Sequence, residues 1–217
     1  MGHDVCAELD RRGVANRGAA SRDVDIRDAG AVKSAIASYA PDAVIHCAAY
    51  TAVDAAENEI EECRAVNVTG TANIAAACRD AGAKMLYIST DYVFNGRGTR
   101  PWAADGEEYA PLSVYGQSKL DGEKAVTAAL DRFFIVRTAW IFGANGRNFV
   151  RTMLNVGKTH DAVRVVNDQI GTPTYSPDLA VLLCDMIATE KYGCYHATNE
   201  GGFVSWYDFT REIYRQA

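Results

Sequence analysis

The stretch ECRAVNVTGTANIAAACRDAGAKMLYIST, residues 62–90, joins a helical pattern directly to a strand pattern. Its first part places small apolar residues at helical spacing, and these are Ala65, Val68, Ala72, Ala75 and Ala76. Gly82 then offers a typical C-terminal stop for the helix. The run AKMLYIST (83–90) is short and almost continuously apolar, as a parallel strand buried on both faces should be. The stretch therefore predicts a helix that leads into a central strand.

The same alternation continues on both sides of this stretch. DAVIHCAA (42–49), FFIVRTAWIFG (133–143) and AVRVVND (162–168) have the pattern of buried strands. RDAGAVKSAIASYAPD (27–42) has the pattern of a helix that closes before its proline. Strands that alternate with helices are typical of right-handed βαβ crossovers. We therefore predict an α/β fold with a Rossmann-like, doubly wound parallel sheet.

The composition predicts a globular chain and argues against several function classes. With 217 residues and 48% hydrophobic content, the chain can bury one core, or a core and a small lobe. A net charge of -6 argues against nucleic acid as the main partner, because phosphate binding requires a basic surface. No apolar run approaches the roughly 20 residues that cross a bilayer, and the first residues do not resemble a signal peptide. We therefore expect a cytoplasmic protein with neither nucleic acid nor membrane as its partner.

Cysteine and histidine give no metal-binding pattern. The six cysteines lack a C-x-x-C pair and lie mostly in apolar or alanine-rich surroundings: Cys6, Cys47, Cys63, Cys78, Cys184 and Cys194. Such cysteines behave as small hydrophobic residues. The four histidines are scattered: His3, His46, His160 and His196. We therefore expect reduced, structural thiols and no metal site.

Three predicted strands end in residues that could bind a ligand. Ligands of doubly wound sheets bind outside the carboxyl ends of the strands. After the first of these strands, Ala48 and Ala49 have small side chains that would let a flat cofactor approach the backbone. After the second, the triplet Ser-Thr-Asp (89–91) supplies two hydroxyls and a carboxylate, and after the third, Trp140 could cover a sugar ring. For the two alanines and for Trp140, ordinary packing is an equally good interpretation.

The stretch SVYGQSKLDGEKA (113–125) opens a predicted helix with Tyr115 and Lys119 four residues apart. At that spacing the phenol and the ammonium share one helix face, with their Cβ atoms about 6 Å apart. A nearby cation lowers the pKa of a phenol from about 10, as general acid–base catalysis requires. With the Thr90 hydroxyl added, a carbonyl oxygen could accept two hydrogen bonds while a hydride reaches its carbon. A bare Y-x-x-x-K often marks a solvated helix, but the neighbouring strands favour an active site here.

Five stretches resemble, in order, the extended branch of the short-chain dehydrogenase/reductases, and within it the dTDP-4-dehydrorhamnose reductase family. They are STDYVFNG (89–96), YGQSKLDGE (115–123), VRTAWIFG (136–143), NDQIGTPTY (167–175) and GCYHATNEGGFVSWYDFTREI (193–213). The last three separate this family from its relatives better than the Tyr/Lys pair does. The resemblance implies reduction of the 4-keto group of dTDP-4-dehydro-6-deoxy-L-mannose by NADPH or NADH, giving dTDP-L-rhamnose in dTDP-rhamnose biosynthesis.

The resemblance also implies roles for individual residues. Tyr115 would donate the proton, and Lys119 would lower the pKa of Tyr115 and bind the nicotinamide ribose. Thr90 would bind the ketone oxygen, and Asp91 and Trp140 would contact the sugar. The residues implied to bind the cofactor are Gly2, Asp25, Ile26, Ala48, Ala49, Tyr50, Tyr115 and Lys119.

Three further residues receive weaker assignments from the resemblance. Asn67, in the run NVTG, matches an asparagine that braces the strand beside the site in such folds. Arg147 or Arg151 could meet the substrate pyrophosphate. No motif chooses between the two arginines, and a solvated side chain is the better interpretation for both.

Other function classes of the same fold stay open. Related dehydratases have T-D-E at the strand tip, whereas this chain has Thr90-Asp91-Tyr92, which favours a simple ketone reduction. A non-catalytic nucleotide-binding regulatory subunit would not need Thr90, Tyr115 and Lys119. A nucleotide-sugar epimerase would share these residues but retain a tightly held NAD. Absorbance at 340 nm with the keto-sugar discriminates among a reductase, an epimerase and a regulatory subunit. Net oxidation of NADPH would indicate the reductase, bound cofactor without net turnover the epimerase, and neither the regulatory subunit.

The two ends of the chain depart from the pattern of the family. The start, MGHDVCAELDRRG (1–13), resembles the last glycine of a glycine-rich turn running into the first helix, and VANRGAASRDVDI (14–26) expresses the next strand poorly. We therefore expect the first strand and the glycine-rich turn to be missing. We also expect an N-terminally truncated NAD(P)-binding domain (1–140) and an incomplete substrate-binding lobe (141–217) interleaved with the last strands.

These departures lead to expectations about binding and assembly. We expect the chain to be a fragment of a longer reductase that binds NAD(P)H weakly by itself. Its partner would be a nucleotide sugar, and a homodimer is one candidate assembly.

Overall fold

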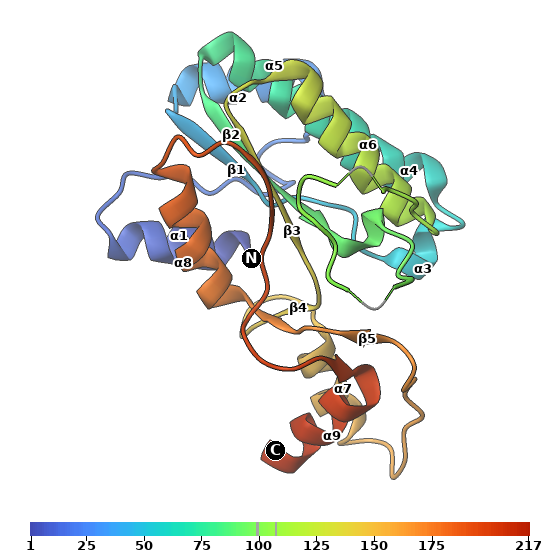
Figure 1. Ribbon diagram of the computed structural model, residues 1–217. Helices are drawn as coiled ribbons and strands as arrows, with labels where there is room; N and C mark the ends of the chain where they lie inside the picture. The colour runs from blue at the N-terminus through green and yellow to red at the C-terminus, as the bar shows by residue number, and fades with distance from the viewer. Residues whose placement is uncertain (99, 107) are drawn as a thin grey trace.

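A computed structural model describes residues 1–98, 100–106 and 108–217 of the chain. It shows a larger body built on a parallel sheet, and a smaller lobe beyond one end of that sheet (Figure 1). The sheet has the spatial order β1-β2-β3-β7, and every neighbouring pair is parallel. Its strands are β1 (Ala43–His46), β2 (Lys84–Thr90), β3 (Phe133–Thr138) and β7 (Gly193–His196). All four carboxyl ends therefore lie at one edge, towards the lobe.

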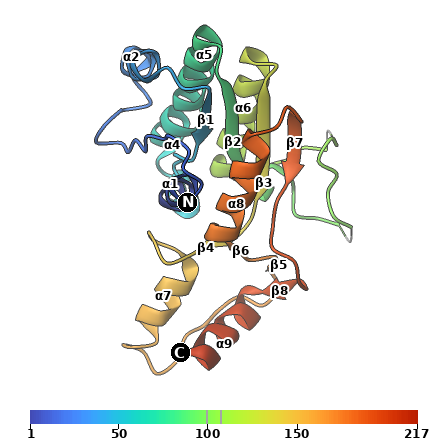
Figure 2. The same cartoon turned by 90° about the vertical axis from the view of Figure 1, so that its left-hand side faces the viewer.

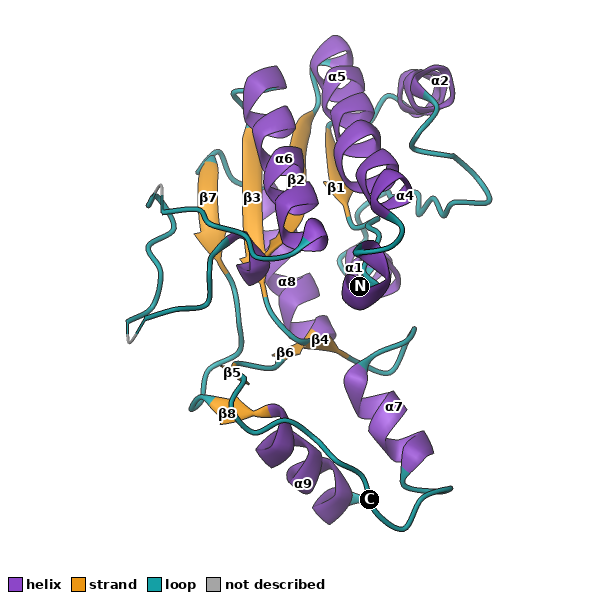
Figure 3. Cartoon of the chain, turned by 90° about the vertical axis from the view of Figure 1, so that its right-hand side faces the viewer, coloured by secondary structure: helices purple, strands orange, loops and turns teal. Residues whose placement is uncertain are grey.

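Helices cover both faces of the sheet, as the continuous apolar pattern of the strands predicts. Met85 and Tyr87 of β2 pack against one set of helices, and Leu86 packs against the other. The first set is α2 (Ala29–Tyr39), α5 (Thr71–Ala81) and α6 (Val114–Ala129); in Figure 3, α2 is seen to one side of α5, and α5 and α6 are seen in front of the strands. The second set is α1 (Gly2–Arg11) and α8 (Ser176–Ile187), seen in front of them in Figure 2. The predicted α/β fold with a parallel sheet is confirmed.

Local sequence signals explain where these helices begin and end. The Asp28 carboxylate caps α2 by accepting the backbone N–H groups of Gly30 and Ala31, at 2.8 and 3.0 Å. Helix α5 ends at Gly82, whose φ of 68° is the left-handed conformation expected of a C-terminal glycine. Helix α2 lies within its predicted range. The longer helix predicted from residue 62 onward is divided, because Ala65 and Val68 lie in a π-helical segment and α5 begins at Thr71.

The connection from β1 to α5 is irregular and lies beside the carboxyl edge of the sheet. It contains the short helices α3 (Val53–Ala56) and α4 (Ile60–Arg64), followed by a single π-helical segment, η1 (Ala65–Gly70). Such π-helical turns occur often at functional sites. A one-turn helix, η2 (Asp91–Val93), follows β2 directly.

The lobe consists of two short strand pairs and two helices (Figure 2). The strand pairs are β4 (Ile141–Phe142) with β6 (Thr174–Tyr175), and β5 (Ile170–Gly171) with β8 (Val204–Ser205). The helices α7 (Phe149–Val156) and α9 (Trp206–Gln216) pack against each other. Aromatic side chains join these elements, and the rings of Trp140 and Trp206 stack with centroids 3.5 Å apart.

One predicted strand is wrong. Residues 162–168 form no strand, and the fourth place in the sheet is taken by β7, whose Cys194 lies in register with Ile135 of β3. The side chains of Val163 and Val166 are exposed. A β-branched run forms a strand only when a neighbour accepts its backbone groups, and β7 already occupies the free edge of β3.

The first element of the structure is α1, which begins at Gly2 as the sequence predicts. Residues 14–26 are all described and contain no strand. The prediction that a first strand and a glycine-rich turn are missing stays a prediction. Within the described residues, no helix has both the length and the apolar character needed to span a membrane.

Candidate active site

The start of α6 is fixed by two side chains from outside the helix body. The Ser113 hydroxyl accepts the backbone N–H of Gly116 at 3.0 Å. The Glu57 carboxylate, from the end of α3, accepts the backbone N–H of Val114 at 2.8 Å. A negative charge is favourable at a helix N-terminus because it pairs with the unsatisfied N–H groups there. The residue between these two donors, Tyr115, is therefore held in a fixed place.

Glycines bring α6 close to its neighbours. A Cβ atom at Gly116 would overlap the backbone carbonyl of Tyr92. A Cβ atom at Gly122 would overlap the Tyr87 hydroxyl and lie 2.7 Å from the carbonyl oxygen of Asn67. The first turn of α6 thus lies directly against the segment that follows β2.

Tyr115 and Thr90 meet at this junction. Thr90 is the last residue of β2, and its hydroxyl donates to Asp91 Oδ1 at 3.0 Å and accepts the backbone N–H of Tyr92 at 3.3 Å. The Tyr115 side chain is 9% exposed, and its ring meets the Tyr92 ring edge-on with centroids 5.7 Å apart.

The pKa of Tyr115 is raised, because burial disfavours the phenolate. The hydroxyl of Thr90 opposes this effect, and the Asp91 carboxylate adds to it. This net rise does not isolate the effect of Lys119, so the expectation that Lys119 lowers the pKa of Tyr115 stays a prediction. A phenol with a raised pKa keeps its proton at neutral pH, which is the form that a proton donor requires.

Lys119 is buried beneath Tyr115, one turn along α6. Its side chain is 2% exposed, and Nζ donates to the carbonyl oxygen of Ile88 at 2.8 Å. The ammonium also lies 4.0 Å from the centroid of the Tyr87 ring. Burial lowers the pKa of Lys119 to about 7, and the carboxylate of Glu123 acts in the opposite direction.

Asn67 connects the end of β1 to α6. Its Oδ1 accepts the backbone N–H of Tyr50 at 2.8 Å, and its Nδ2 donates to the carbonyl oxygen of Tyr50 at 3.1 Å. The same Nδ2 donates to the Ser118 hydroxyl at 2.9 Å. The bracing expected of Asn67 is thus confirmed, and the segment Ala48–Tyr50 is held beside the helix that carries Tyr115.

The other residues expected near a cofactor lie around the same edge. Gly2 is close to Cys47, and Ile26 packs against Gly70 at the end of η1. The backbone carbonyl of Ile26 accepts from Asn73 Nδ2 at 2.9 Å. The Asp25 carboxylate pairs with Arg27 at 2.8 Å. The structure thus places these residues around the β1 side of the carboxyl edge.

Trp140 lies in the lobe and has an unusual backbone conformation. Its φ is 50°, a left-handed value that side chains other than glycine rarely adopt. Its ring stacks on Trp206, and a Cβ atom added at Gly171 would overlap the ring. These contacts describe a packed aromatic cluster, so the expected contact between Trp140 and the sugar stays a prediction.

A family model described as "RmlD substrate binding domain" matches residues 1–217, the whole chain. The dTDP-4-dehydrorhamnose reductase of Streptomyces griseus is 45% identical over 221 residues, which cover 99% of this chain and 72% of that relative. The chain belongs to the RmlD family of dTDP-4-dehydrorhamnose reductases.

Two further matches show the spread of this RmlD family. The crystal structure of the dTDP-4-dehydrorhamnose reductase of Bacillus anthracis in complex with NADP has a TM-score of 0.95 and 39% identity, covering 99% of this chain and 76% of its own. The dTDP-4-keto-6-deoxy-D-glucose reductase of Streptomyces niveus is 37% identical over 194 residues, which are 89% of this chain and 67% of that protein. The chain thus spans about two thirds to three quarters of these RmlD relatives.

Sequence reasoning missed one cluster in this RmlD chain. Glu123, Arg137 and Ser89 form a buried group next to Lys119, with Ser89 Oγ donating to Glu123 at 2.5 Å. The available signal was the spacing of Glu123, which follows Lys119 by four residues and therefore shares its helix face.

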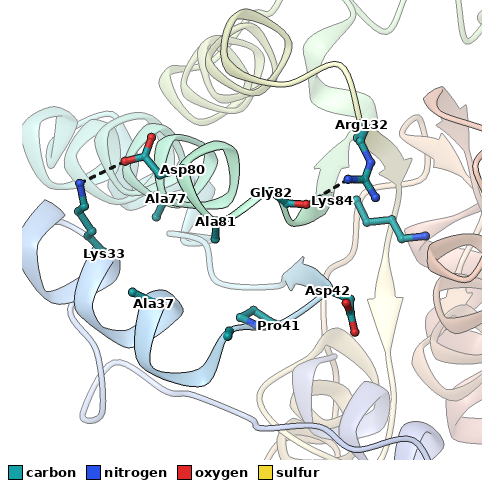
Figure 4. A pocket seen from close by; sticks show the side chains of 11 residues that line it. Lys33, Ala37, Pro41, Asp42, Ala77, Asp80, Ala81, Gly82, Lys84 and Arg132 are labelled. Carbon is teal, nitrogen blue, oxygen red and sulfur yellow. Dashed lines mark hydrogen bonds and ion pairs between the residues drawn. The ribbon is translucent and has the colours of Figure 1, made fainter.

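A separate hollow lies at the opposite edge of the sheet of this RmlD chain (Figure 4). It is formed where β1, β2 and β3 begin, with Asp42, Lys84 and Arg132 in its wall. Arg132 and Lys84 each donate to a backbone carbonyl, those of Gly82 and Thr189. The hollow therefore has no part in the site around Tyr115. Among the described residues, no three His, Cys, Asp or Glu side chains come together as a metal site would require.

Proposed function

We propose that this protein reduces the 4-keto group of dTDP-4-dehydro-6-deoxy-L-mannose with NADPH or NADH, giving dTDP-L-rhamnose. The observation that carries the proposal is the junction of Thr90, Tyr115 and Lys119 in a chain of the RmlD family. These three groups supply a hydrogen-bond donor, a proton donor and a buried cation at one point of the carboxyl edge.

In this proposal the ketone oxygen lies between the hydroxyls of Thr90 and Tyr115. Tyr115 holds its proton at neutral pH and transfers it to the oxygen as negative charge develops there. The Thr90 hydroxyl donates to Asp91 in the structure, so it turns from Asp91 to donate to the ketone. A bound nicotinamide would supply the hydride to the carbonyl carbon. The ammonium of Lys119 then stabilises the phenolate that remains on Tyr115.

The residues at the β1 side of the edge fit a dinucleotide. The N-terminus of α1, beginning at Gly2, lies beside Cys47 at the end of β1, and helix N-termini bind phosphate groups. Ala48 and Ala49 leave the backbone accessible next to this end. In the proposal the cofactor contacts Gly2, Asp25, Ile26, Ala48, Ala49, Tyr50, Tyr115 and Lys119, and the sugar contacts Thr90, Asp91 and Trp140.

The proposed division of labour follows the two parts of the chain. In this proposal residues 1–140 bind the cofactor. Residues 141–217 form the lobe that binds the nucleotide sugar, interleaved with α8 and β7, which belong to the larger body. The lobe supports this division because it lies beyond the carboxyl ends of the strands (Figure 1). Dimer formation and a cytoplasmic location remain predictions, which light scattering and cell fractionation would check.

The activity is tested by following NADPH oxidation at 340 nm with the keto-sugar and identifying the product by mass spectrometry and NMR. Net oxidation with formation of dTDP-L-rhamnose supports the proposal. Interconversion of nucleotide sugars without net oxidation would instead indicate an epimerase. Nucleotide binding without turnover would indicate a regulatory subunit.

A second substrate deserves the same assay, because one relative is named for a different keto-sugar. The Streptomyces niveus protein is a dTDP-4-keto-6-deoxy-D-glucose reductase. The chemistry proposed for Thr90 and Tyr115 is the same for any 4-keto group. The ratio of kcat/KM for the two keto-sugars therefore decides the substrate without affecting the reaction class.

A further inference from the structure

A buried ion pair lies one turn beyond Lys119 on α6. Arg137 of β3 donates to both carboxylate oxygens of Glu123, from Nε at 2.9 Å and from Nη2 at 2.7 Å. The side chain of Arg137 is 0% exposed and that of Glu123 is 5% exposed. Ser89, which lies in register with Arg137 on the neighbouring strand, donates a third hydrogen bond to the carboxylate.

Two of the three remaining N–H groups of Arg137 also have partners. Nη2 donates to the Tyr109 hydroxyl at 2.8 Å, and Nη1 donates to the backbone carbonyl of Ala104 at 3.1 Å. The guanidinium carbon lies 5.3 Å and 4.9 Å from the ring centroids of Phe94 and Tyr109. Arg137 is therefore held in place by contacts with Glu123, Tyr109, Ala104 and Phe94.

Glu123 and Lys119 are close enough along α6 to form an ion pair. They share one face of α6 at a spacing of four residues, and both are buried. Yet the structure, which describes both residues, shows no ion pair between them. The Lys119 ammonium instead donates to the carbonyl oxygen of Ile88. The next residue, Ser89, donates its hydroxyl to Glu123.

We propose that Arg137 is a positioning residue for the Lys119 ammonium: by binding both oxygens of Glu123, it prevents that carboxylate from pairing with Lys119. A buried carboxylate without Arg137 would take the nearest cation, because an unpaired charge is costly in a low-dielectric interior. That cation is Lys119. Pairing would draw the ammonium along α6, away from Tyr115, where the proposed reduction needs it.

The other titratable groups around Lys119 do not offer a competing anion. These groups are Tyr115 on α6, His46 on β1, Cys47 directly after β1, Cys63 on α4 and Tyr87 on β2. Burial lowers the pKa of His46 to about 3 and raises the pKa of Cys47 to about 12, so both side chains are neutral near pH 7. Glu123 is therefore the carboxylate among the groups that act on Lys119.

The test compares Arg137→Met, Glu123→Gln and the double variant. In Arg137→Met the carboxylate should bind Lys119, raising the pKa of Lys119 by about one unit and lowering kcat about tenfold or more. In the double variant no carboxylate competes, so kcat should return to within about threefold of the wild type. If the ion pair only supports the fold, the double variant will stay as inactive as Arg137→Met, and the proposal is overturned.

The pKa of Lys119 is read directly, by NMR of chains labelled with 13C and 15N at lysine. Glu123→Gln should lower this pKa by about one unit, and an unchanged value would overturn the proposal even if Arg137→Met fails to fold. The inference rests on the proposed function, but this titration needs no substrate. A wild type that does not reduce the keto-sugar would contradict the proposed function and leave the titration to decide the role of Arg137.

Discussion

Asn67 binds Tyr50 by both polar groups of the Tyr50 backbone, with its side-chain oxygen 2.8 Å from the N–H nitrogen and its side-chain nitrogen 3.1 Å from the carbonyl oxygen. This pair of bonds imitates the pairing of a neighbouring strand just where β1 has ended. The third bond, to Ser118, ties the same segment to α6. One amide side chain in a π-helical turn thus links the proposed cofactor edge to the helix of the proposed proton donor.

Replacing Asn67 by alanine should lower the free energy of unfolding by roughly 1–3 kcal/mol, because partly buried backbone groups of Tyr50 lose their partners. Urea titration measures the change. Asn16→Ala is the matched control, since Asn16 bonds Asp10 and the Val14 carbonyl on the exposed surface and should change the stability little. A loss below about 0.5 kcal/mol for Asn67→Ala would contradict the bracing role.

Tyr115→Phe keeps the ring in its contact with Tyr92 and removes the transferable proton. We expect kcat to fall by on the order of 10²–10⁴ while the dissociation constant of NADPH changes little. Steady-state kinetics and a fluorescence titration of NADPH measure the two quantities. Tyr39→Phe, at an exposed tyrosine near the end of α2, is the control and should retain full activity. More than about a tenth of the wild-type turnover in Tyr115→Phe would exclude the role.

Lys119 should make the stability depend on pH near neutrality. Its pKa falls from 10.5 to about 7 on folding, so between these values the unfolded chain binds more protons than the folded one. Stability from this group therefore rises with pH through that window and is lowest below pH 7. Between pH 7 and 8 the gain should be roughly 1 kcal/mol. Denaturation of the wild type and of Lys119→Met at both pH values isolates the effect, and equal slopes would disprove it.

The backbone of Trp140 gives a prediction that does not depend on activity. At a φ of 50°, a side chain with a Cβ atom is strained, whereas glycine is not. Trp140→Gly should therefore be about 1 kcal/mol more stable than Trp140→Ala, measured by urea titration. At Trp102, which does not have a positive φ, glycine should be no more stable than alanine. If the glycine variant were more stable than the alanine variant at both positions, the backbone strain at Trp140 would be disproved.

Trp140→Ala also tests the expected sugar contact. A ring that covers the sugar would raise KM for the keto-sugar more than the dissociation constant of NADPH, because apolar area is lost on one side of the site only. If the ring only stacks on Trp206, its loss would lower the free energy of unfolding by about 3–5 kcal/mol and weaken the binding of both ligands equally. Thermal melts with each ligand separate these two outcomes.

Local pattern was sufficient for the strands and helices of the sheet but not for its last member. The run 83–90 is buried on both faces, so its apolar pattern is unambiguous, and β2 lies at residues 84–90. The run 162–168 has equally good strand residues, yet it pairs with no strand, and its Val166 carbonyl accepts the backbone N–H of Tyr207 at the start of α9 instead. Strand β7 has only four residues and begins with Gly193, so its place beside β3 depends on long-range pairing that local pattern does not contain.

The features of the candidate site also separate into those that local sequence pattern predicts and those that depend on distant segments. The face shared by Tyr115 and Lys119 follows from helical spacing and was predictable. The raised pKa of Tyr115 was not, because it depends on burial by distant segments. The ion pair of Glu123 and Arg137 also requires the register that sets Ser89 opposite Arg137. Spacing along one helix could suggest Glu123 but not its partner.

The close approach of α6 at Gly116 and Gly122 has a consequence for how such an enzyme can change. Glycine inside a helix costs about 0.5–1 kcal/mol relative to alanine, so alanine would ordinarily be the stabilising replacement. Here an alanine at Gly116 would collide with the backbone carbonyl of Tyr92, and no exchange of side chains removes a backbone atom. The distance between the Tyr115 side chain and Thr90 is therefore set by the contact of the α6 backbone at Gly116 with the backbone of Tyr92. If the lobe binds the sugar and Tyr115 transfers the proton as proposed, substitutions in the lobe can alter which sugar is accepted without changing the distance from Tyr115 to Thr90.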